Sequence, residues 1–195
     1  MLLPLTLHPA LFGIVQGGRF KDLREESTKA ISAMGFDGFG IGGTFLKEDM
    51  GNAVRWVNEI LPPEKPRHLL GIGEPTDILT AIENGCDTFD CVAPTRMARN
   101  SALYSKNGRL NITNSKHSSE YIPIEEGCDC YTCQTFTRAY LHHLFDAKEM
   151  LAATLASIHN LRFVVRLVDN ARQAILDKQF LEYKEQFLKE YTVGG

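Results

Sequence analysis

The sequence predicts an α/β fold with a parallel sheet, followed by a metal-binding segment and a helical C-terminal part. Short apolar runs alternate with amphipathic stretches from Leu11 to Asp90, which is the pattern of successive βα units. Three of the five cysteines cluster between residues 128 and 133, and sequence with helical periodicity follows almost to the end. The 195 residues suffice for one sizeable core but fall short of the roughly 250 residues of a complete (β/α)8 barrel.

The elements of the sheet follow from the order of apolar and amphipathic segments. Helices are predicted over Lys21–Met34 and Asp49–Ile60, and a third runs from Pro75, which suits the first helical position, to Gly85. Because these helices separate the strands, they act as crossovers, and the sheet is predicted to be parallel. The predicted strands are LFGIV at 11–15, GFGIGG at 38–43, HLLGIG at 68–73 and TFDCV at 88–92.

Glycines or polar side chains end each of these apolar runs. Carboxyl ends of strands are where α/β folds place their sites. A tight βα turn explains any one glycine pair at least as well, whereas several such ends in succession favour a site. The segments are Gln16-Gly17-Gly18, Gly42-Gly43, Gly71-Ile72-Gly73 and Asp90.

The part after Asp90 begins with a polar, turn-rich stretch from Cys91 to Ser119. The formal net charge of the chain is -3, which alone does not indicate a nucleic-acid partner. This stretch nevertheless holds five basic residues and no acid, which predicts a track for phosphate groups. The alternative is a solvated loop whose charges pair with acids elsewhere. The basic residues are Arg96, Arg99, Lys106, Arg109 and Lys116.

Near the end of the chain, apolar residues at helical spacing predict a core-facing stripe rather than a binding site. The stripe consists of Leu161, Val164, Val165, Val168 and Ile175.

The cellular compartment is predicted to be the cytosol. No stretch approaches the ~20 apolar residues of a membrane helix, so no membrane partner is expected. The opening MLLPLTLHPA lacks a basic region and has a proline at position 4, which makes it a poor signal peptide. An odd number of cysteines with a tight cluster suits metal ligation in a reducing compartment better than a disulfide framework.

Cys128, Cys130 and Cys133 form a C-x-C-x2-C cluster. Thiolates at this spacing converge on one tetrahedral Zn2+, whereas disulfides between such close neighbours are strained. The fourth ligand is left open by spacing, because His142, His143 and His159 all follow in helical sequence. A Cys3His set fills every position of a tetrahedral ion, so the zinc is expected to be structural.

Asp90 ends the fourth predicted strand in apolar company. A buried carboxylate is costly unless it is paired or takes part in a reaction. From the residues alone, a helix cap, a salt-bridge partner and a nucleophile are all open interpretations.

Six motifs in order resemble the tRNA-guanine transglycosylases, also called queuine tRNA-ribosyltransferases. They are LFGIVQGG, FGIGG, LLGIGEP, FDCVAPTRMARN, CDCYTCQTFTRAYLHHL and SIHNLRF, and the resemblance runs from about Leu11 to Phe187. It implies the C-terminal half of a (β/α)8 TIM barrel with an inserted zinc-binding subdomain and C-terminal helices. The implied segments are the half barrel at 1–100, the zinc subdomain at 101–160 and a helical segment at 161–195.

The resemblance also implies a pentosyltransferase of queuosine biosynthesis. Such an enzyme exchanges guanine at the tRNA wobble position for a 7-deazaguanine base, preQ1 or queuine. Asp90 corresponds to the nucleophile that attacks the ribose C1′ and forms a covalent intermediate. Gln16 and the Gly43 backbone correspond to groups that contact the base, and His159 to the fourth zinc ligand.

Two further residue sets come from the same resemblance. Phe136, Tyr140 and His143 match an aromatic cluster at the interface of a homodimer. The RNA-contacting residues correspond to Gly71, Ile72, Gly73, Glu74, Pro75, Thr76, Asp77, Thr95, Arg96, Met97, Ala98 and Arg99.

The chain departs from the resembled pattern in two ways. It lacks the half that carries the general acid/base aspartate, so we expect negligible base exchange from this chain alone. The loop from Gly42 to Met50 is short, with Thr44 in place of an apolar residue, which leaves the incoming base open. A half barrel exposes strand edges, so pairing with an N-terminal half or with a second copy is expected.

Two alternative functions are weighed against this enzyme. One is a non-catalytic, zinc-containing subunit for tRNA binding and dimerisation, which the missing half favours and Asp90 with Gln16 disfavours. The other is an unrelated zinc-stabilised nucleic-acid-binding domain, which leaves the ordered strand-end motifs unexplained.

Overall fold

The computed structural model describes residues 9–43 and 47–191. The chain divides into two compact units, the first within residues 1–72 and 80–90 and the second within 73–79 and 91–195. The helix that spans residues 75–83 contributes to both units. The motif-based division at residues 100 and 160 stays a prediction.

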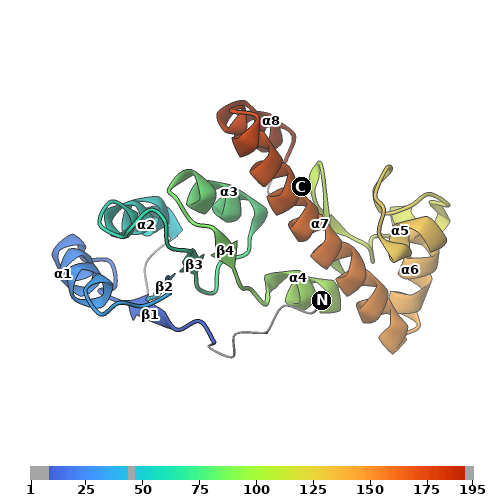
Figure 1. Ribbon diagram of the computed structural model, residues 1–195. Helices are drawn as coiled ribbons and strands as arrows, with labels where there is room; N and C mark the ends of the chain where they lie inside the picture. Colours follow the sequence, from blue (N-terminus) through green and yellow to red (C-terminus); the bar gives the residue numbers. More distant parts are fainter. Residues whose placement is uncertain (1–8, 44–46, 192–195) are drawn as a thin grey trace, which may run out of the picture. The chain divides into compact units, whose positions relative to one another are not determined.

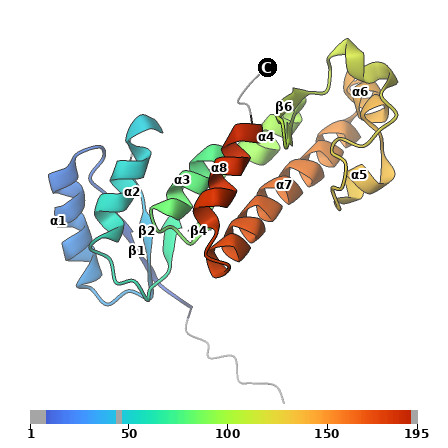
Figure 2. The same cartoon turned by 90° about the horizontal axis from the view of Figure 1, so that it is seen from above.

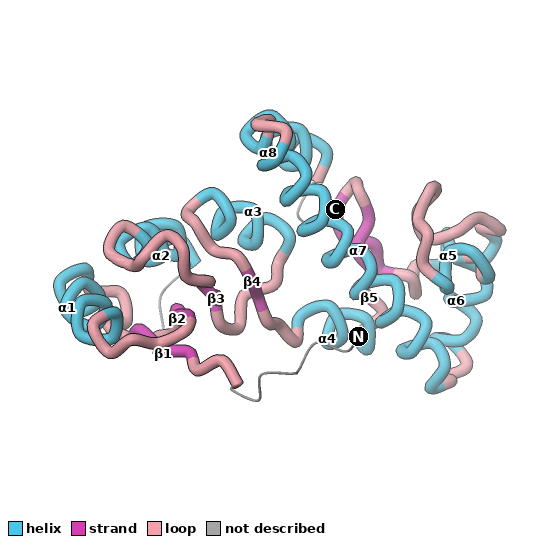
Figure 3. Tube along the Cα trace, viewed as in Figure 1, coloured by secondary structure: helices cyan, strands magenta, loops and turns pink. Residues whose placement is uncertain are grey.

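The first unit is built on a four-stranded parallel sheet, in which the strands follow one another in sequence order (Figures 1 and 3). This confirms the predicted α/β fold with a parallel sheet, and each strand overlaps an apolar run identified in the sequence, although β3 begins one residue earlier than its run. The elements are β1 (Phe12–Val15), α1 (Lys21–Ser32), β2 (Gly38–Ile41), a 3-10 turn η1 (Lys47–Asp49), α2 (Met50–Asn58), β3 (Arg67–Leu69), α3 (Pro75–Glu83) and β4 (Thr88–Phe89).

One face of this sheet packs against helices, and α1 and α2 lie along it (Figure 2). Val15, Phe39 and Leu69 point from three strands into this core, where they meet Val54 and Val57 of α2. Phe12 and Ile14 of β1, and Leu70 directly after β3, are instead exposed. The sheet therefore buries only one of its faces within the part of the chain that the structure describes.

Arg24 of α1 ties together the loops that follow β1 and β2. Its side chain is fully buried, and it donates from Nε to the carbonyl of Gly18 at 2.6 Å and from Nη2 to the carbonyl of Gly42 at 3.1 Å. Burial lowers the pKa of this guanidinium. The guanidinium is tolerated in the core because it hydrogen-bonds carbonyl groups of the two glycine-rich loops that no strand satisfies.

The second unit is mostly helical. The stretch after Asp90, expected to consist of polar turns, instead contains a helix and an antiparallel hairpin. Its elements are α4 (Ala93–Arg99), β5 (Ala102–Ser105), β6 (Gly108–Asn111), a 3-10 turn η2 (Ser115–Ser119), α5 (Tyr131–Thr135), α6 (Arg138–Asp146), α7 (Met150–Leu176) and α8 (Phe180–Glu190).

The predicted core stripe of α7 is wrong for three of its five residues, whereas Val164 and Val168 are half-buried and Val164 packs against a core cluster. Leu161, Val165 and Ile175 are 45%, 53% and 49% exposed. A neighbouring stripe of the same periodicity is buried instead, because the residues that bond to other elements lie on it. It consists of Ala152, Leu155, Ala156, His159, Asn160, Phe163, Leu167 and Ala171.

Helix α7 has 27 residues, and a window of 18 residues within it has a mean hydropathy of 1.3, so by length and composition alone it could cross a membrane. The central helix of a folded core meets the same criteria. Here α7 packs against α4, α5, α6 and β5, and its buried stripe contains a histidine and an asparagine. These contacts make α7 the core helix of the second unit.

Candidate functional site

The cysteine cluster lies where a loop enters the short helix α5. Cys130 caps this helix, and its Sγ accepts a hydrogen bond from the Cys133 backbone N–H at 3.3 Å. Cys128 lies on the preceding loop, and His159 reaches the same place from the middle of α7. The four potential ligand atoms lie within 4.8 Å of one another, and all four residues are buried. Of the histidines that spacing left open, the structure brings His159 to the cysteines.

The geometry of this group fits a tetrahedral metal ion. His159 Nδ1 lies 3.8, 3.7 and 3.3 Å from the sulfurs of Cys128, Cys130 and Cys133. A tetrahedral zinc with ordinary bond lengths places nitrogen and sulfur about 3.6 Å apart. On its other side, His159 Nε2 donates to the carbonyl of Tyr104 at 2.7 Å. That bond fixes the tautomer in which Nδ1 carries a lone pair toward the sulfurs.

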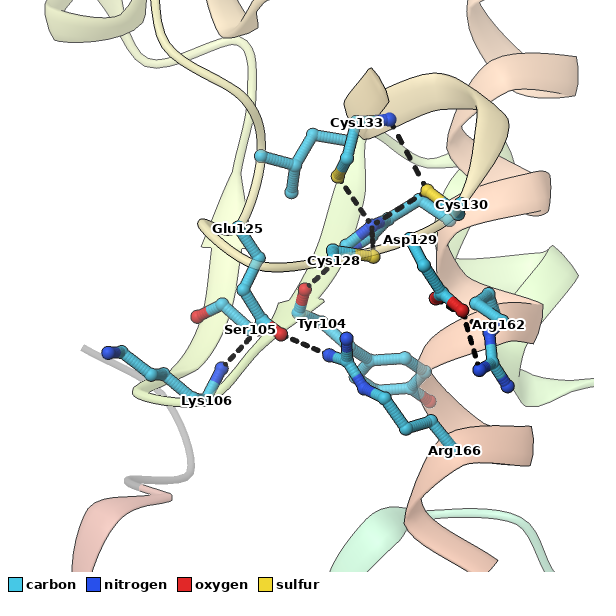
Figure 4. Close-up of polar contacts among 12 residues, drawn as sticks. Tyr104, Ser105, Lys106, Glu125, Cys128, Asp129, Cys130, Cys133, Arg162 and Arg166 are labelled. Carbon is cyan, nitrogen blue, oxygen red and sulfur yellow. Dashed lines mark hydrogen bonds and ion pairs between the residues drawn. The ribbon is translucent and has the colours of Figure 1, made fainter. Parts of the chain in front are cut away.

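Neighbouring polar groups brace the cluster (Figure 4). Arg162 of α7 makes two parallel bonds of 2.8 Å to Asp129, which lies between two of the cysteines. Glu125, on the same loop, accepts from the Lys106 backbone N–H at 2.7 Å and also bonds Arg166 of α7. Charged pairs at Glu125 and Asp129 therefore hold the loop to α7 before and after Cys128.

Asn160, next to the histidine ligand, is a buried polar residue that the sequence reasoning missed. Its Oδ1 accepts from the Tyr104 backbone N–H, and its Nδ2 donates to the carbonyls of Pro94 and Ala102, each at 3.0 Å. The side chain thus satisfies backbone groups of α4 and β5 that lie in the core. Its place beside His159 in the SIHNLRF motif was the only available signal.

The structure corrects one expectation about Asp90. The sequence suggested a buried carboxylate, but its side chain is 61% exposed at the end of β4. It is not sealed in an ion pair with Lys or Arg among the described residues. Its Oδ1 instead accepts from the Gly71 backbone N–H and from His68 Nε2, each at 3.1 Å. The carboxylate is therefore both oriented and accessible.

These hydrogen bonds lower the pKa of Asp90. The Gly71 N–H has the largest effect, and the His68 side chain adds to it. His68 lies on β3 beside β4, and its Nδ1 is 2.8 Å from Thr88 Oγ1. One imidazole thus bridges two side chains of the next strand, Thr88 and Asp90. His68 was not identified from the sequence, because pairing between β3 and β4 creates the contact.

Replacing His68 with phenylalanine is expected to raise the pKa of Asp90 toward, but not up to, the ordinary aspartate value of 3.8. The shift is incomplete because the Gly71 N–H remains in place. Since the folded pKa lies below the unfolded one, ionised Asp90 stabilises the fold above the unfolded pKa, and this contribution is lost as pH falls through the folded pKa. Carboxyl 13C chemical shifts across an acid titration measure the midpoint.

The matched control for this titration is His143→Phe, the same change at an exposed position of α6. It should leave the Asp90 midpoint where it is. An unchanged midpoint in His68→Phe would remove His68 from any role in holding this carboxylate.

Gln16 and Gly43 lie close together, as a shared base-contacting role requires. A Cβ built on Gly42 would lie 2.9 Å from Gln16 Nε2, and one built on Gly43 would lie 3.3 Å from Gln16 Oε1. Gly43 also has a φ of +85°, which side chains rarely adopt. The amide of Gln16 therefore rests on a backbone that only glycine can form. Thr44, singled out in the same loop, lies outside the described residues.

The predicted RNA-contacting residues divide between the two units. Gly71 and Ile72 belong to the first, and 73–77 together with 95–99 belong to the second. On α4, Arg96 and Arg99 are exposed, whereas Ala98 is fully buried and offers no side chain. Glu74 bonds Arg109 at 2.6 Å and raises the pKa of that guanidinium. For Arg109, the alternative of a charge paired with an acid is confirmed.

The aromatic set gathers on one surface. The rings of Phe136 and Tyr140 stack with centroids 5.0 Å apart, and Tyr131 meets Phe136 edge-on at 5.7 Å. Tyr131, Tyr140 and His143 are exposed. An aromatic ladder open to solvent is typical of an interaction surface.

Comparison with known proteins agrees with these features. The family described as Queuine tRNA-ribosyltransferase matches residues 6–193. A protein named Queuine tRNA-ribosyltransferase from Caldanaerobacter subterraneus subsp. tengcongensis is 46% identical over 189 residues, which cover 95% of this chain and 50% of that protein. A protein of the same name from Helicobacter acinonychis is 48% identical over 186 residues, with 94% and 50% covered.

A third relative with this name, from Symbiobacterium thermophilum, is 45% identical over 188 residues, with 95% of this chain and 47% of the relative covered. The chain thus spans about half the length of the relatives it matches. Because the match takes in nearly all of the described sheet, the cysteine cluster and α7, the chain belongs to the queuine tRNA-ribosyltransferase family.

Proposed function

We propose that this chain supplies the nucleophile, the base-contacting side chain and the structural metal site of a tRNA-guanine transglycosylase. The reaction would exchange guanine at the wobble position for a 7-deazaguanine base, preQ1 or queuine, in queuosine biosynthesis. The observation that carries this proposal is an accessible Asp90 carboxylate, held by Gly71 and His68 at the carboxyl end of a parallel strand. The printed names of the relatives support a transferase that acts on tRNA.

In the proposed first step, an Asp90 oxygen bonds to C1′ of the wobble ribose while the bond from C1′ to the guanine nitrogen breaks. The bond's electron pair leaves with guanine, which needs a proton, and an ester joins RNA to Asp90. In the second step, a nitrogen of the incoming base attacks C1′, loses its proton and releases the carboxylate. Asp90 is ionised at neutral pH, as aspartates ordinarily are, and the hydrogen bonds that lower its pKa also orient the carboxylate.

Gln16 has the chemistry to read the base. Its side-chain amide offers both a donor and acceptors, as the edge of guanine requires. The amide lies against the Gly42-Gly43 backbone, and a Cβ at Gly43 would come within 3.3 Å of its Oε1, so glycine there lets the amide keep this place. The wobble base has to leave its stack to reach this place.

We assign Zn2+ to the Cys128, Cys130, Cys133 and His159 group. Three thiolates and one imidazole are a donor set typical of structural zinc and leave no position open for substrate. Bound there, the ion would link the cysteine loop to α7 and take no part in the exchange.

Association is part of the proposal. The exposed Phe12, Ile14 and Leu70 face of the sheet suits the interior of a (β/α)8 barrel completed by an N-terminal half. The surface that carries Phe136, Tyr140 and His143 suits a homodimer interface. We place the protein in the cytoplasm, where its tRNA substrate is found.

The alternative of a non-catalytic subunit for tRNA binding and dimerisation is less favoured. A docking module has no need of an oriented, accessible carboxylate beside a glutamine that rests on glycine backbone. Base exchange distinguishes the two functions.

The test mixes this chain with the N-terminal half of one of the relatives, a tRNA with guanine at the wobble position and radiolabelled guanine. We expect label to enter the tRNA only when both halves are present, because this chain lacks the second carboxylate that moves protons. Near-normal exchange by this chain alone would contradict the proposed division of roles. A complete absence of exchange with both halves folded would favour the docking module.

A further inference from the structure

A cavity of about 500 Å3 lies in the second unit, between the β5–β6 hairpin, η2 and the start of α6. Arg109 and Lys116 of the predicted phosphate track line it, together with residues to which the sequence analysis gave no role. Its walls include Ser105, Arg109, Asn114, Lys116, His117 and Arg138. All of these residues belong to one compact unit, so the cavity does not depend on how the two units are arranged.

The charge of the lining is positive. Arg109, Lys116 and Arg138 contribute cationic groups, and no acidic residue is among the lining residues. The two arginines are fixed from outside the cavity. Arg109 bonds Glu74, and Arg138 bonds Glu120 at 3.0 Å and the carbonyls of Pro123 and Ile124.

Lys116 differs from the two arginines. It is exposed on η2 and makes no hydrogen bond or ion pair with any residue that the structure describes. A lysine on the rim of a polar cavity with fixed cationic walls is free to bind an anion.

His117 supplies a second, independent observation. Its side chain is only 1% exposed, and Nδ1 lies 2.7 Å from Glu120 Oε2. Because a carboxylate only accepts hydrogen bonds, Nδ1 carries the proton in this contact. Nε2 is buried and has no hydrogen-bond partner within the described chain. With the proton on Nδ1, Nε2 is an acceptor, so its missing partner is a donor such as a water or a ligand hydroxyl.

We propose that this cavity is a phosphate-binding subsite, which holds one phosphodiester group of the RNA strand between Lys116 and Arg138, while a hydroxyl of the attached ribose donates to His117 Nε2. The volume exceeds that of a phosphate and admits part of the attached ribose. This inference rests on the proposed function, because it assigns the phosphate to the RNA substrate. The amides of Asn114 and the hydroxyl of Ser105 suit the ribose and phosphate oxygens.

Binding of an anticodon stem-loop RNA to the full chain tests the subsite. Lys116→Gln is expected to weaken binding about 3- to 10-fold and to reduce the slope of log affinity against log salt by about 0.7, the value for one phosphate contact on a single strand. Lys189→Gln, the same change at an exposed position of α8 in the same unit, is the matched control and should change neither quantity.

Inorganic phosphate alone is the second probe, and imidazole resonances of His117 are its readout. We expect these resonances to shift as phosphate is added and the shift to be weaker in Lys116→Gln. Equal RNA affinities and salt slopes for the two lysine variants would overturn the assignment to RNA. A His117 ring that responds to neither phosphate nor RNA would overturn the subsite.

Failure of the subsite and failure of the proposed function give different results. If wild-type chain binds no RNA while His117 responds to phosphate, the proposed function fails and the cavity is a site for free anions. If RNA binds and only the Lys116 effect is missing, the proposed function stands and the subsite is wrong. Dispersed amide spectra of both variants establish that they are folded.

Discussion

Cys128→Ser is expected to abolish metal binding and to destabilise the second unit by several kcal/mol. A structural zinc contributes on the order of 10 kcal/mol in small modules, more than the about 2–5 kcal/mol lost when a core leucine is truncated. Cys128 Sγ contacts His159 Nδ1, so the variant loses a ligand with little change in volume. Metal content by mass spectrometry should fall from about one zinc per chain to none.

The thermal midpoint reports the loss of stability. A chain of this size loses about 2–4 °C for each kcal/mol, so half of the zinc contribution lowers the midpoint by more than about 10 °C. Cys91→Ser is the matched control, because Cys91 Sγ accepts from the Ala93 N–H at 3.2 Å, which a hydroxyl also does, and Cys91 is not one of the four grouped metal ligands. Equal midpoints for the two serine variants would show that no metal stabilises the fold.

Asp90→Asn is expected to eliminate the covalent RNA adduct and to reduce base exchange at least about 1000-fold in the mixture of the two halves. The amide is nearly the same size and still accepts from the Gly71 N–H, but it is a far weaker nucleophile than a carboxylate. Denaturing gel electrophoresis of protein with labelled tRNA detects the adduct, and incorporation of labelled guanine measures the exchange.

Asp37→Asn provides a matched control for this variant. Asp37 is also an exposed carboxylate of the first unit, and it accepts from the Leu11 backbone N–H at 2.8 Å. It should form the adduct as wild type does. An adduct that persists in Asp90→Asn would transfer the role of nucleophile to another residue and remove the central assignment of the proposed function.

The order of the βα units was predictable because each apolar run is short and bounded by glycine or a helix signal. Pro75, for example, begins α3 where the sequence placed a helix start. The three cysteines were also predictable as metal ligands, since their spacing alone brings thiolates together. The resemblance, and not the spacing, selected His159 from the three histidines.

The predictions from sequence that failed concern contacts between residues that are far apart in the sequence. Asp90 was expected to be buried because its sequence neighbours are apolar, but the exposed face of the sheet leaves it accessible. His68 and Asn160 were missed because their partners lie on β4 in one case and on α4 and β5 in the other. Periodicity gives the spacing of residues on a helix face but not which of two apolar faces meets the core.

Because His159 and Asn160 are consecutive, their contacts fix the rotation of α7 about its own axis. A helix rotates by about 100° at each residue, so a slip of one residue would carry both side chains away from Tyr104 at once. The contacts of His159 and Asn160 with Tyr104 are therefore made together at only one rotation of α7 about its axis. The apolar residues outside that rotation, Leu161 and Val165 among them, are held facing outward however favourable their burial would be.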